Sequence, residues 1–136
     1  MLIEGSIIKD GRWHLVEVPL LDAMTQGHNR AEALSMVADL VETLVDRPGF
    51  KVQVQDHGHE RLTLLVSDPA AVIALGLRRR REAAGLSLQD VADRLGAKSK
   101  NAYARYEQGT SIPTVTKLAE LLQAVDPERD LAVSVG

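Results

Sequence analysis

Residues 87–109 read SLQDVADRLGAKSKNAYARYEQG and decide the fold of the second half of this 136-residue chain. Ser87 and Ser99 are suited to cap the start of a helix, because a side-chain oxygen can accept a hydrogen bond from a free backbone N–H group of the first turn. Gly96 and Gly109 are suited to follow the end of one, because glycine adopts the left-handed conformation without strain. The pattern predicts two short helices joined by a tight turn.

The apolar residues of this stretch fit two helices that cross closely. Ala92 is small enough for close contact, and Val91, Leu95 and Tyr103 can close the core between the helices. With these residues at these spacings, the stretch resembles the helix-turn-helix of the Xre/Cro-like repressors. The resemblance implies a DNA-binding segment.

Polar residues cluster where the second helix begins. In the geometry that the resemblance implies, this end of the helix faces base edges in the major groove. Lys100 can donate to guanine O6 and N7, and Asn101 can bond adenine in a bidentate way. The predicted DNA-binding residues are Lys98, Ser99, Lys100, Asn101, Arg105 and Gln89, of which Lys98, Ser99 and Arg105 are assigned to phosphates.

The stretch departs from the repressor pattern at two places. Leu88 stands where these repressors commonly have glutamine, and Gln89 follows it. The turn between Gly96 and Glu107 has one extra residue, which shifts by one the positions assigned to bases. The alternative interpretation is that these are ordinary polar residues on the surface of a helical bundle.

Two further groups of side chains leave a choice between DNA contact and packing. The run Arg78-Arg79-Arg80-Arg81 points around most of a helix, so at most two of its members can face one DNA strand. An ion pair of Arg80 or Arg81 within the same module is as plausible as a phosphate contact. We favour core packing for Tyr103 and leave the role of Tyr106 open.

The flanking sequence extends this module to four helices. A helix is predicted from Asp68 to Ala84, and a last one begins near Pro113 and ends at Asp126. Residues 69–127 are therefore predicted to form an all-α helix-turn-helix domain. The tail at 128–136 alternates like a strand with no partner nearby, so we expect it to contact another subunit.

In the first half of the chain, the apolar residues recur with a different period. Residues 2–9 and 12–18 are predicted strands joined by a hairpin turn at Asp10-Gly11. A loop is predicted at 19–27, and a helix is predicted to start at Asn29. Two alternating strands at 51–55 and 61–66 follow. Residues 1–68 are thus predicted to form a β-β-α-β-β domain, so the whole chain is of the α+β class.

The order of these features resembles the HicB family of antitoxins. The resemblance rests on the hairpin of residues 2–19, on Thr25-Gln26-Gly27 before the helix, and on residues 101–109. It implies a truncated RNase H-like sheet domain followed by a helix-turn-helix. The segment Leu20-Leu21-Asp22-Ala23-Met24 departs from the family, since it lacks the glycine and cysteine often present in that loop.

The charge is divided between the two halves of the chain. The overall net charge of −3 argues against nucleic acid as a partner, but residues 1–68 hold six Lys/Arg against eleven Asp/Glu, whereas residues 69–136 hold ten against eight. The segment 78–105 alone carries eight basic and three acidic residues. An acidic module and a basic one predict two different partners.

The composition also excludes several classes of function. The chain contains no cysteine, and residues 1–6 have neither a basic start nor a long apolar core, so we expect a cytoplasmic protein. The turn Asp56-His57-Gly58-His59-Glu60 is better explained as a polar hairpin than as a metal site. We predict no cofactor and no catalytic site, because Glu4, Asp10, Glu17 and Asp22 form no evident constellation.

The leading hypothesis is an antitoxin that represses its own operon. As the resemblance implies, residues 1–68 would neutralise a basic, HicA-like mRNA interferase, and the second module would bind operator DNA as a dimer or tetramer. The alternative is a stand-alone transcription regulator whose first module senses a small ligand. A nuclease is a third, less favoured interpretation.

Overall fold

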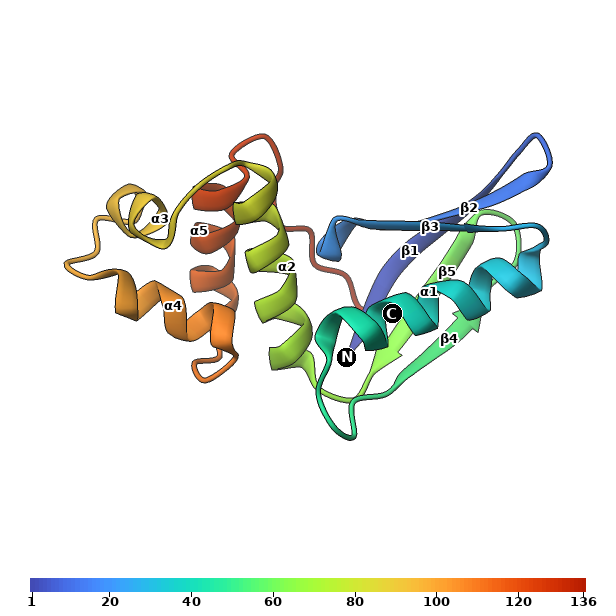
Figure 1. Ribbon diagram of the computed structural model, residues 1–136, viewed down its shortest axis with the longest axis horizontal. Helices are drawn as coiled ribbons and strands as arrows, with labels where there is room; N and C mark the ends of the chain where they lie inside the picture. Colours follow the sequence, from blue (N-terminus) through green and yellow to red (C-terminus); the bar gives the residue numbers. More distant parts are fainter. The chain divides into compact units, whose positions relative to one another are not determined.

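The computed structural model describes all 136 residues, which divide into two compact units. Unit 1 is Met1–Val72 and unit 2 is Ile73–Gly136. The division falls inside one helix, α2 (Pro69–Ala83), so the two units share a continuous backbone element (Figure 1). Unit 1 is built on an antiparallel sheet and unit 2 on helices, which makes the chain α+β as predicted.

Unit 1 contains a five-stranded antiparallel sheet. The strands lie in the order β3-β2-β1-β5-β4, so β3 and β4 are its edges. Their bounds are β1 (Leu2–Asp10), β2 (Trp13–Val18), β3 (Ala23–Gly27), β4 (Val52–Asp56) and β5 (Arg61–Val66). Alternation along β1 sends Ile3 and Ile7 into the core and leaves Leu2 and Ile8 exposed, as period-two side-chain placement requires.

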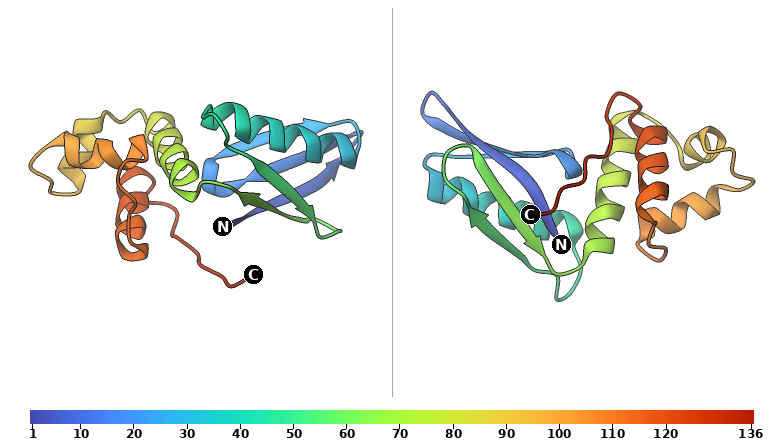
Figure 2. Two further views of the ribbon diagram at one scale, coloured as in Figure 1. Left: turned by 90° about the horizontal axis from the view of Figure 1, so that it is seen from below. Right: turned by 180° about the vertical axis from the view of Figure 1, so that it is seen from behind.

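Helix α1 (Arg30–Val45) lies along one face of this sheet (Figure 2). It begins where the sequence predicts, because the side chain of Asn29 accepts a hydrogen bond from Glu32 N at 2.8 Å. Val37 and Val41 are fully buried one turn apart on its sheet-facing side. The helix ends at Asp46, which adopts the left-handed conformation with φ 49°.

The predicted β-β-α-β-β order lacks one strand. The segment expected as a loop at 19–27 contains a short 3-10 helix, η1 (Pro19–Leu21), and the edge strand β3, which pairs with β2. Alanine and glycine are poor strand formers, so β3 exists through pairing and burial more than through propensity. Burial is tight at Gly27, which packs against α1 so closely that an added Cβ would lie 2.5 Å from Ala33 N.

The first hairpin is shifted by one residue from its predicted turn. Asp10 pairs with Trp13, so the two-residue loop is Gly11-Arg12 rather than Asp10-Gly11. Gly11 supplies the positive φ of 60° that this loop needs, and glycine adopts it at no steric cost. The strands that flank the loop are the predicted ones.

Unit 2 is a compact helical bundle. After α2 come α3 (Leu88–Arg94), α4 (Lys100–Gln108) and α5 (Val115–Val125), close to the predicted bounds. None of the helices is long and apolar enough to cross a membrane. The bundle closes around one cluster of buried residues, which are Leu77, Val91, Tyr103, Leu121, Leu122, Ala124 and Val125.

Residues 128–136 form no strand within the single chain, and the predicted pairing of this tail with another subunit stays a prediction. A strand needs a neighbour for its backbone N–H and C=O groups, and this segment has none within the chain. Leu131 packs against the buried cluster of unit 2, whereas Val133 and Val135 are 71% and 102% exposed. The alternating pattern indicates that the segment can pair as a strand, but it does not say which strand it pairs with.

Candidate nucleic-acid interface

Helices α3 and α4 form the helix-turn-helix, and their caps are the predicted ones. Ser87 and Asp90 make a complete capping box, in which the side chain of each accepts a hydrogen bond from the backbone N–H of the other, at 3.0 and 2.8 Å. The side chain of Ser99 accepts from Asn101 N at 3.1 Å at the start of α4. These caps fix where each helix begins.

The turn between the two helices is set by Gly96, whose φ is 68°. Gly96 N donates to Asp93 O at 3.1 Å and Ala97 N donates to Ala92 O at 2.9 Å. This pair of bonds is the Schellman arrangement, which satisfies the last carbonyl groups of a helix and turns the chain sharply. The chain then needs only residues 97–99 before α4 begins.

The structure brings five of the six predicted DNA-binding residues together. Ser99 caps α4, Lys100 and Asn101 are its first two residues, and all three are exposed. Arg105 is also exposed and lies one turn after Asn101 on the same side of the helix. Four of these residues lie at the start of α4 and Arg105 lies one turn further along, and we call Lys98, Ser99, Lys100, Asn101 and Arg105 the α4 cluster.

Gln89 is placed differently from the α4 cluster. It lies in the first turn of α3, where its side-chain amide donates to Asp93 Oδ1 at 2.8 Å. Leu88, the residue that departs from the repressor pattern, is partly buried against the core of unit 2. Gln89 is therefore an exposed residue of the first turn of α3, and the second hydrogen of its side-chain NH2 group can contact a phosphate while the first stays bonded to Asp93.

The basic residues of segment 78–105 differ in whether their side chains have a partner within unit 2. Arg80 Nη1 donates to Asp126 Oδ2 at 2.7 Å, and only 8% of the Arg80 side chain is exposed. Arg94 Nη1 donates to Ala124 O at 2.9 Å, near the end of α5. Lys98, Lys100 and Arg105 make no such contact through their side chains, so their charges are available to an outside partner.

Arg81 holds α4 in place. Its guanidinium donates to both Glu107 oxygens, at 2.7 and 3.0 Å, and to Leu86 O at 2.9 Å. The side chain of Glu107 is only 6% exposed, and its hydrogen bonds to Arg81 are the main cause that raises the pKa of that guanidinium. For Arg80 and Arg81 the ion-pair alternative is thus confirmed.

The two tyrosines of α4 lie in different surroundings. Tyr103 is 1% exposed and belongs to the core, as favoured from the sequence. Burial is the main cause that raises the pKa of its hydroxyl, and the nearby Glu107 carboxylate adds to it. Tyr106 is partly buried against the same core and also lines an open pocket.

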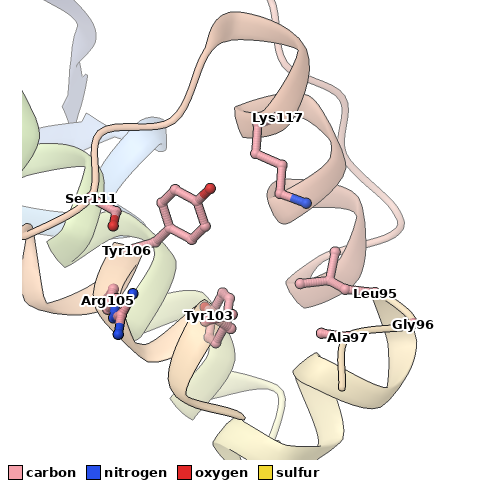
Figure 3. Close-up of a pocket in the computed structure, with 9 residues that line it drawn as sticks. Leu95, Gly96, Ala97, Tyr103, Arg105, Tyr106, Ser111 and Lys117 are labelled. Carbon is pink, nitrogen blue, oxygen red and sulfur yellow. The ribbon is translucent and has the colours of Figure 1, made fainter. Parts of the chain in front are cut away.

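That pocket of about 450 Å³ lies beside the α4 cluster (Figure 3). Arg105 and Tyr106 line it from α4, and Lys117 lines it from the first turn of α5. Sequence reasoning missed Lys117, whose Nζ is 3.2 Å from Glu120 Oε2. A cation in the first turn of a helix is unfavourable, because the positive end of the helix dipole lies there. The position of Lys117 in the sequence could therefore have singled it out.

In unit 1, the histidine-containing turn is occupied by structural contacts. The Arg30 guanidinium donates to both oxygens of Asp56, at 2.8 and 2.6 Å, and to His59 O at 2.7 Å. His57 Nε2 lies 2.8 Å from Thr63 Oγ1. These contacts join the β4–β5 turn to the start of α1 and to β5, and they explain the side chains of Asp56 and His57 as parts of the fold.

Comparison with known proteins supports the assignment of unit 2. Residues 77–127 match the family model described as helix-turn-helix, which covers α3, α4, α5 and the end of α2. No curated protein matches the chain. The family is one of DNA-binding regulators and is generally non-enzymatic. The geometry and the match together make residues 77–127 an Xre/Cro-like helix-turn-helix segment, which supports DNA binding and transcription regulation as the role of unit 2.

Proposed function

We propose that this protein is an antitoxin that represses its own operon, with unit 2 on operator DNA and unit 1 on a basic, HicA-like mRNA interferase. The observation that carries the DNA side is the α4 cluster. Three cations without an internal partner and one exposed amide lie along the first two turns of the second helix of a helix-turn-helix and just before it.

The members of the α4 cluster take different roles in the proposal. Lys100 and Asn101 read base edges, because lysine matches guanine O6 and N7 and asparagine matches adenine N6 and N7. Lys98, Ser99 and Arg105 hold phosphates, which position the protein and carry no sequence information. Gln89 supplies a further phosphate contact from α3. A palindromic operator has two half-sites, so the proposed DNA-bound form is at least a dimer.

Charge supports the proposal for unit 1. Three of its four arginines, Arg30, Arg47 and Arg61, already pair with carboxylates of the same unit. Carboxylates that are exposed and outside any ion pair are Asp10, Asp39, Asp46 and Glu60. An excess of exposed negative charge speeds the encounter with a basic RNA-binding protein and discriminates against acidic partners.

The resemblance to HicB antitoxins is the second support for this role of unit 1. The hairpin of residues 2–19 and the segment Thr25-Gln26-Gly27 carry the resemblance, and in the structure they form β1, β2 and the end of β3. The same proposal describes the sheet as a truncated RNase H-like domain. It divides the chain into domains at 1–68, 69–127 and 128–136.

The test is co-expression of the full chain with a basic protein of about sixty residues encoded beside it, a size that suits one minimal domain. We expect growth rescue and a complex whose mass contains both proteins. Reversing Asp39 and Asp46 to lysine should abolish rescue, whereas Lys100→Ala with Asn101→Ala should leave it intact. Absence of a toxic neighbour, together with operator binding that changes with a small metabolite, would favour the ligand-sensing regulator.

A further inference from the structure

The segment after α5 leaves unit 2 from a fixed point. Arg80 holds the carboxylate of Asp126 at 2.7 Å, and Arg129 N donates to Asp126 O at 3.2 Å. Gln123 Nε2 then donates to Arg129 O at 3.0 Å and also to the Asp130 carboxylate. Contacts to α2 and α5 therefore hold the chain up to residue 130.

At Leu131 the contacts of this segment change from hydrogen bonds to apolar packing. Leu131 is partly buried against the core of unit 2, but the backbone and side chains of residues 132–136 make no hydrogen bond. Val133 and Val135 are 71% and 102% exposed, and they alternate with Ala132 and Ser134. An anchored segment with a strand pattern, unpaired backbone groups and exposed valines is a template for pairing with another chain.

We infer that residues 131–135 pair with the same residues of a second copy, as an antiparallel two-stranded ribbon centred on Val133. The occupant is a second copy because proposed binding to two half-sites requires two-fold symmetry, and in this respect the inference rests on the proposed function. A two-fold axis makes a segment pair with itself in antiparallel orientation. Centring on Val133 pairs all five residues, with Leu131 opposite Val135.

The side-chain pattern supports this register. Residues 131, 133 and 135 share one face of a strand, and residues directly opposite in an antiparallel pair share a face as well. The six leucine and valine side chains of the ribbon therefore lie on one side. Leu131 already packs against unit 2, so that side is turned toward the helical core, where Val133 and Val135 lose their exposure. This packing matters because an isolated two-stranded ribbon is marginal in water.

Cross-linking tests the register directly, because the chain contains no cysteine. In full-length protein, Val133→Cys places two thiols opposite each other, within the range that a disulfide needs after small adjustment. Ser134→Cys is the matched control, since its counterpart is displaced along the ribbon. We expect Cys at 133 to form covalent dimers at least about tenfold faster under mild oxidation. Equal rates, or faster cross-linking of the 134 variant, would overturn the proposed pairing.

The mass in solution is the second measurement. We expect the unmodified chain to have twice the 14.8 kDa of one copy by light scattering, and Val133→Lys with Val135→Lys to reduce it to one copy. Both valines are exposed in the single chain, so the fold should persist, and the control Ile112→Lys, also at an exposed site, should remain dimeric. An unchanged mass in the double variant would contradict the inference.

Operator footprinting separates this inference from the proposed function. Protection of two half-sites without cross-linking at position 133 would refute the ribbon and leave operator binding standing. Efficient cross-linking at position 133 without protection of any operator would refute the proposed function and leave the ribbon standing.

Discussion

Arg81 and Glu107 join the end of α2 to the last turn of α4 by two hydrogen bonds of 2.7 and 3.0 Å. The same guanidinium donates to Leu86 O in the segment before α3. One side chain thus ties together the three parts of unit 2 whose mutual orientation determines how the α4 cluster is presented. A basic run that suggests DNA contact in the sequence is here, at Arg81, a support for the reading helix.

Replacing Arg81 by methionine should destabilise unit 2. The carboxylate of Glu107 would stay largely buried without its partner, at a cost of about 2–4 kcal/mol, between the values for surface and fully buried pairs. Urea unfolding monitored by circular dichroism measures the change. The matched control is Arg61→Met, which breaks the exposed pair with Glu4 and should alter stability little. Equal stability of the two variants would refute the supporting role of Arg81.

Lys98 and Asn101 should respond differently to substitution by alanine. Loss of Asn101 should relax base preference and cost about 1–3 kcal/mol on the preferred operator, because a bidentate base contact is removed. Loss of Lys98 should weaken all sequences alike and lower the salt slope by about one, as expected of a phosphate contact. Binding titrations at several salt concentrations measure both effects, and Lys9→Ala in unit 1 serves as the control.

Gly27→Ala should disrupt unit 1. An added Cβ would lie 2.5 Å from Ala33 N and 2.8 Å from Ala33 Cα, and backbone atoms of α1 cannot move aside without shifting the helix. We expect a lower thermal midpoint for unfolding of unit 1. Gly49→Ala, whose added Cβ has open space and meets only the strain of a positive φ, should cost less. The opposite ranking would show that the approach of α1 to β3 is looser than described.

The ion pair of Asp56 with Arg30 should make unit 1 sensitive to acid. The Arg30 guanidinium, and then the N–H of Gly58, hold the pKa of the Asp56 carboxyl well below its usual range. Its contribution to stability is therefore present above the ordinary value of about 3.9 and is lost as the pH falls below it. Asp56→Asn should flatten this acid limb of the stability curve. An unchanged curve would mean that the pair contributes nothing to folding.

Unit 2 could be predicted closely from the sequence because its signals are local. Ser87 and Ser99 are caps, Gly96 and Gly109 follow helix ends, and each needs only backbone groups within a few residues. The α4 cluster follows from the same signals, since the cap at Ser99 fixes which residues open the helix. The role of Arg81 was left open because its partner lies 26 residues away.

Unit 1 shows where local signals are insufficient. Strand β3 was missed because Ala23 and Gly27 have little intrinsic preference for a strand and owe it to pairing with β2 and to the approach of α1. The tail shows the converse limit of local signals. The alternation around Val133 is a strand pattern, but a strand forms only where another strand meets it, and none does within one chain.

The most direct test of the central claim is a footprint of the operator with the Lys100→Ala, Asn101→Ala variant. Both side chains are exposed at the start of α4, so the fold of unit 2 should persist, as circular dichroism can verify. The account predicts that the unmodified protein protects two half-sites and that the variant loses this protection while retaining weak, salt-sensitive binding to any DNA. An unchanged footprint would contradict the account, because α4 would then not be the helix that reads the bases.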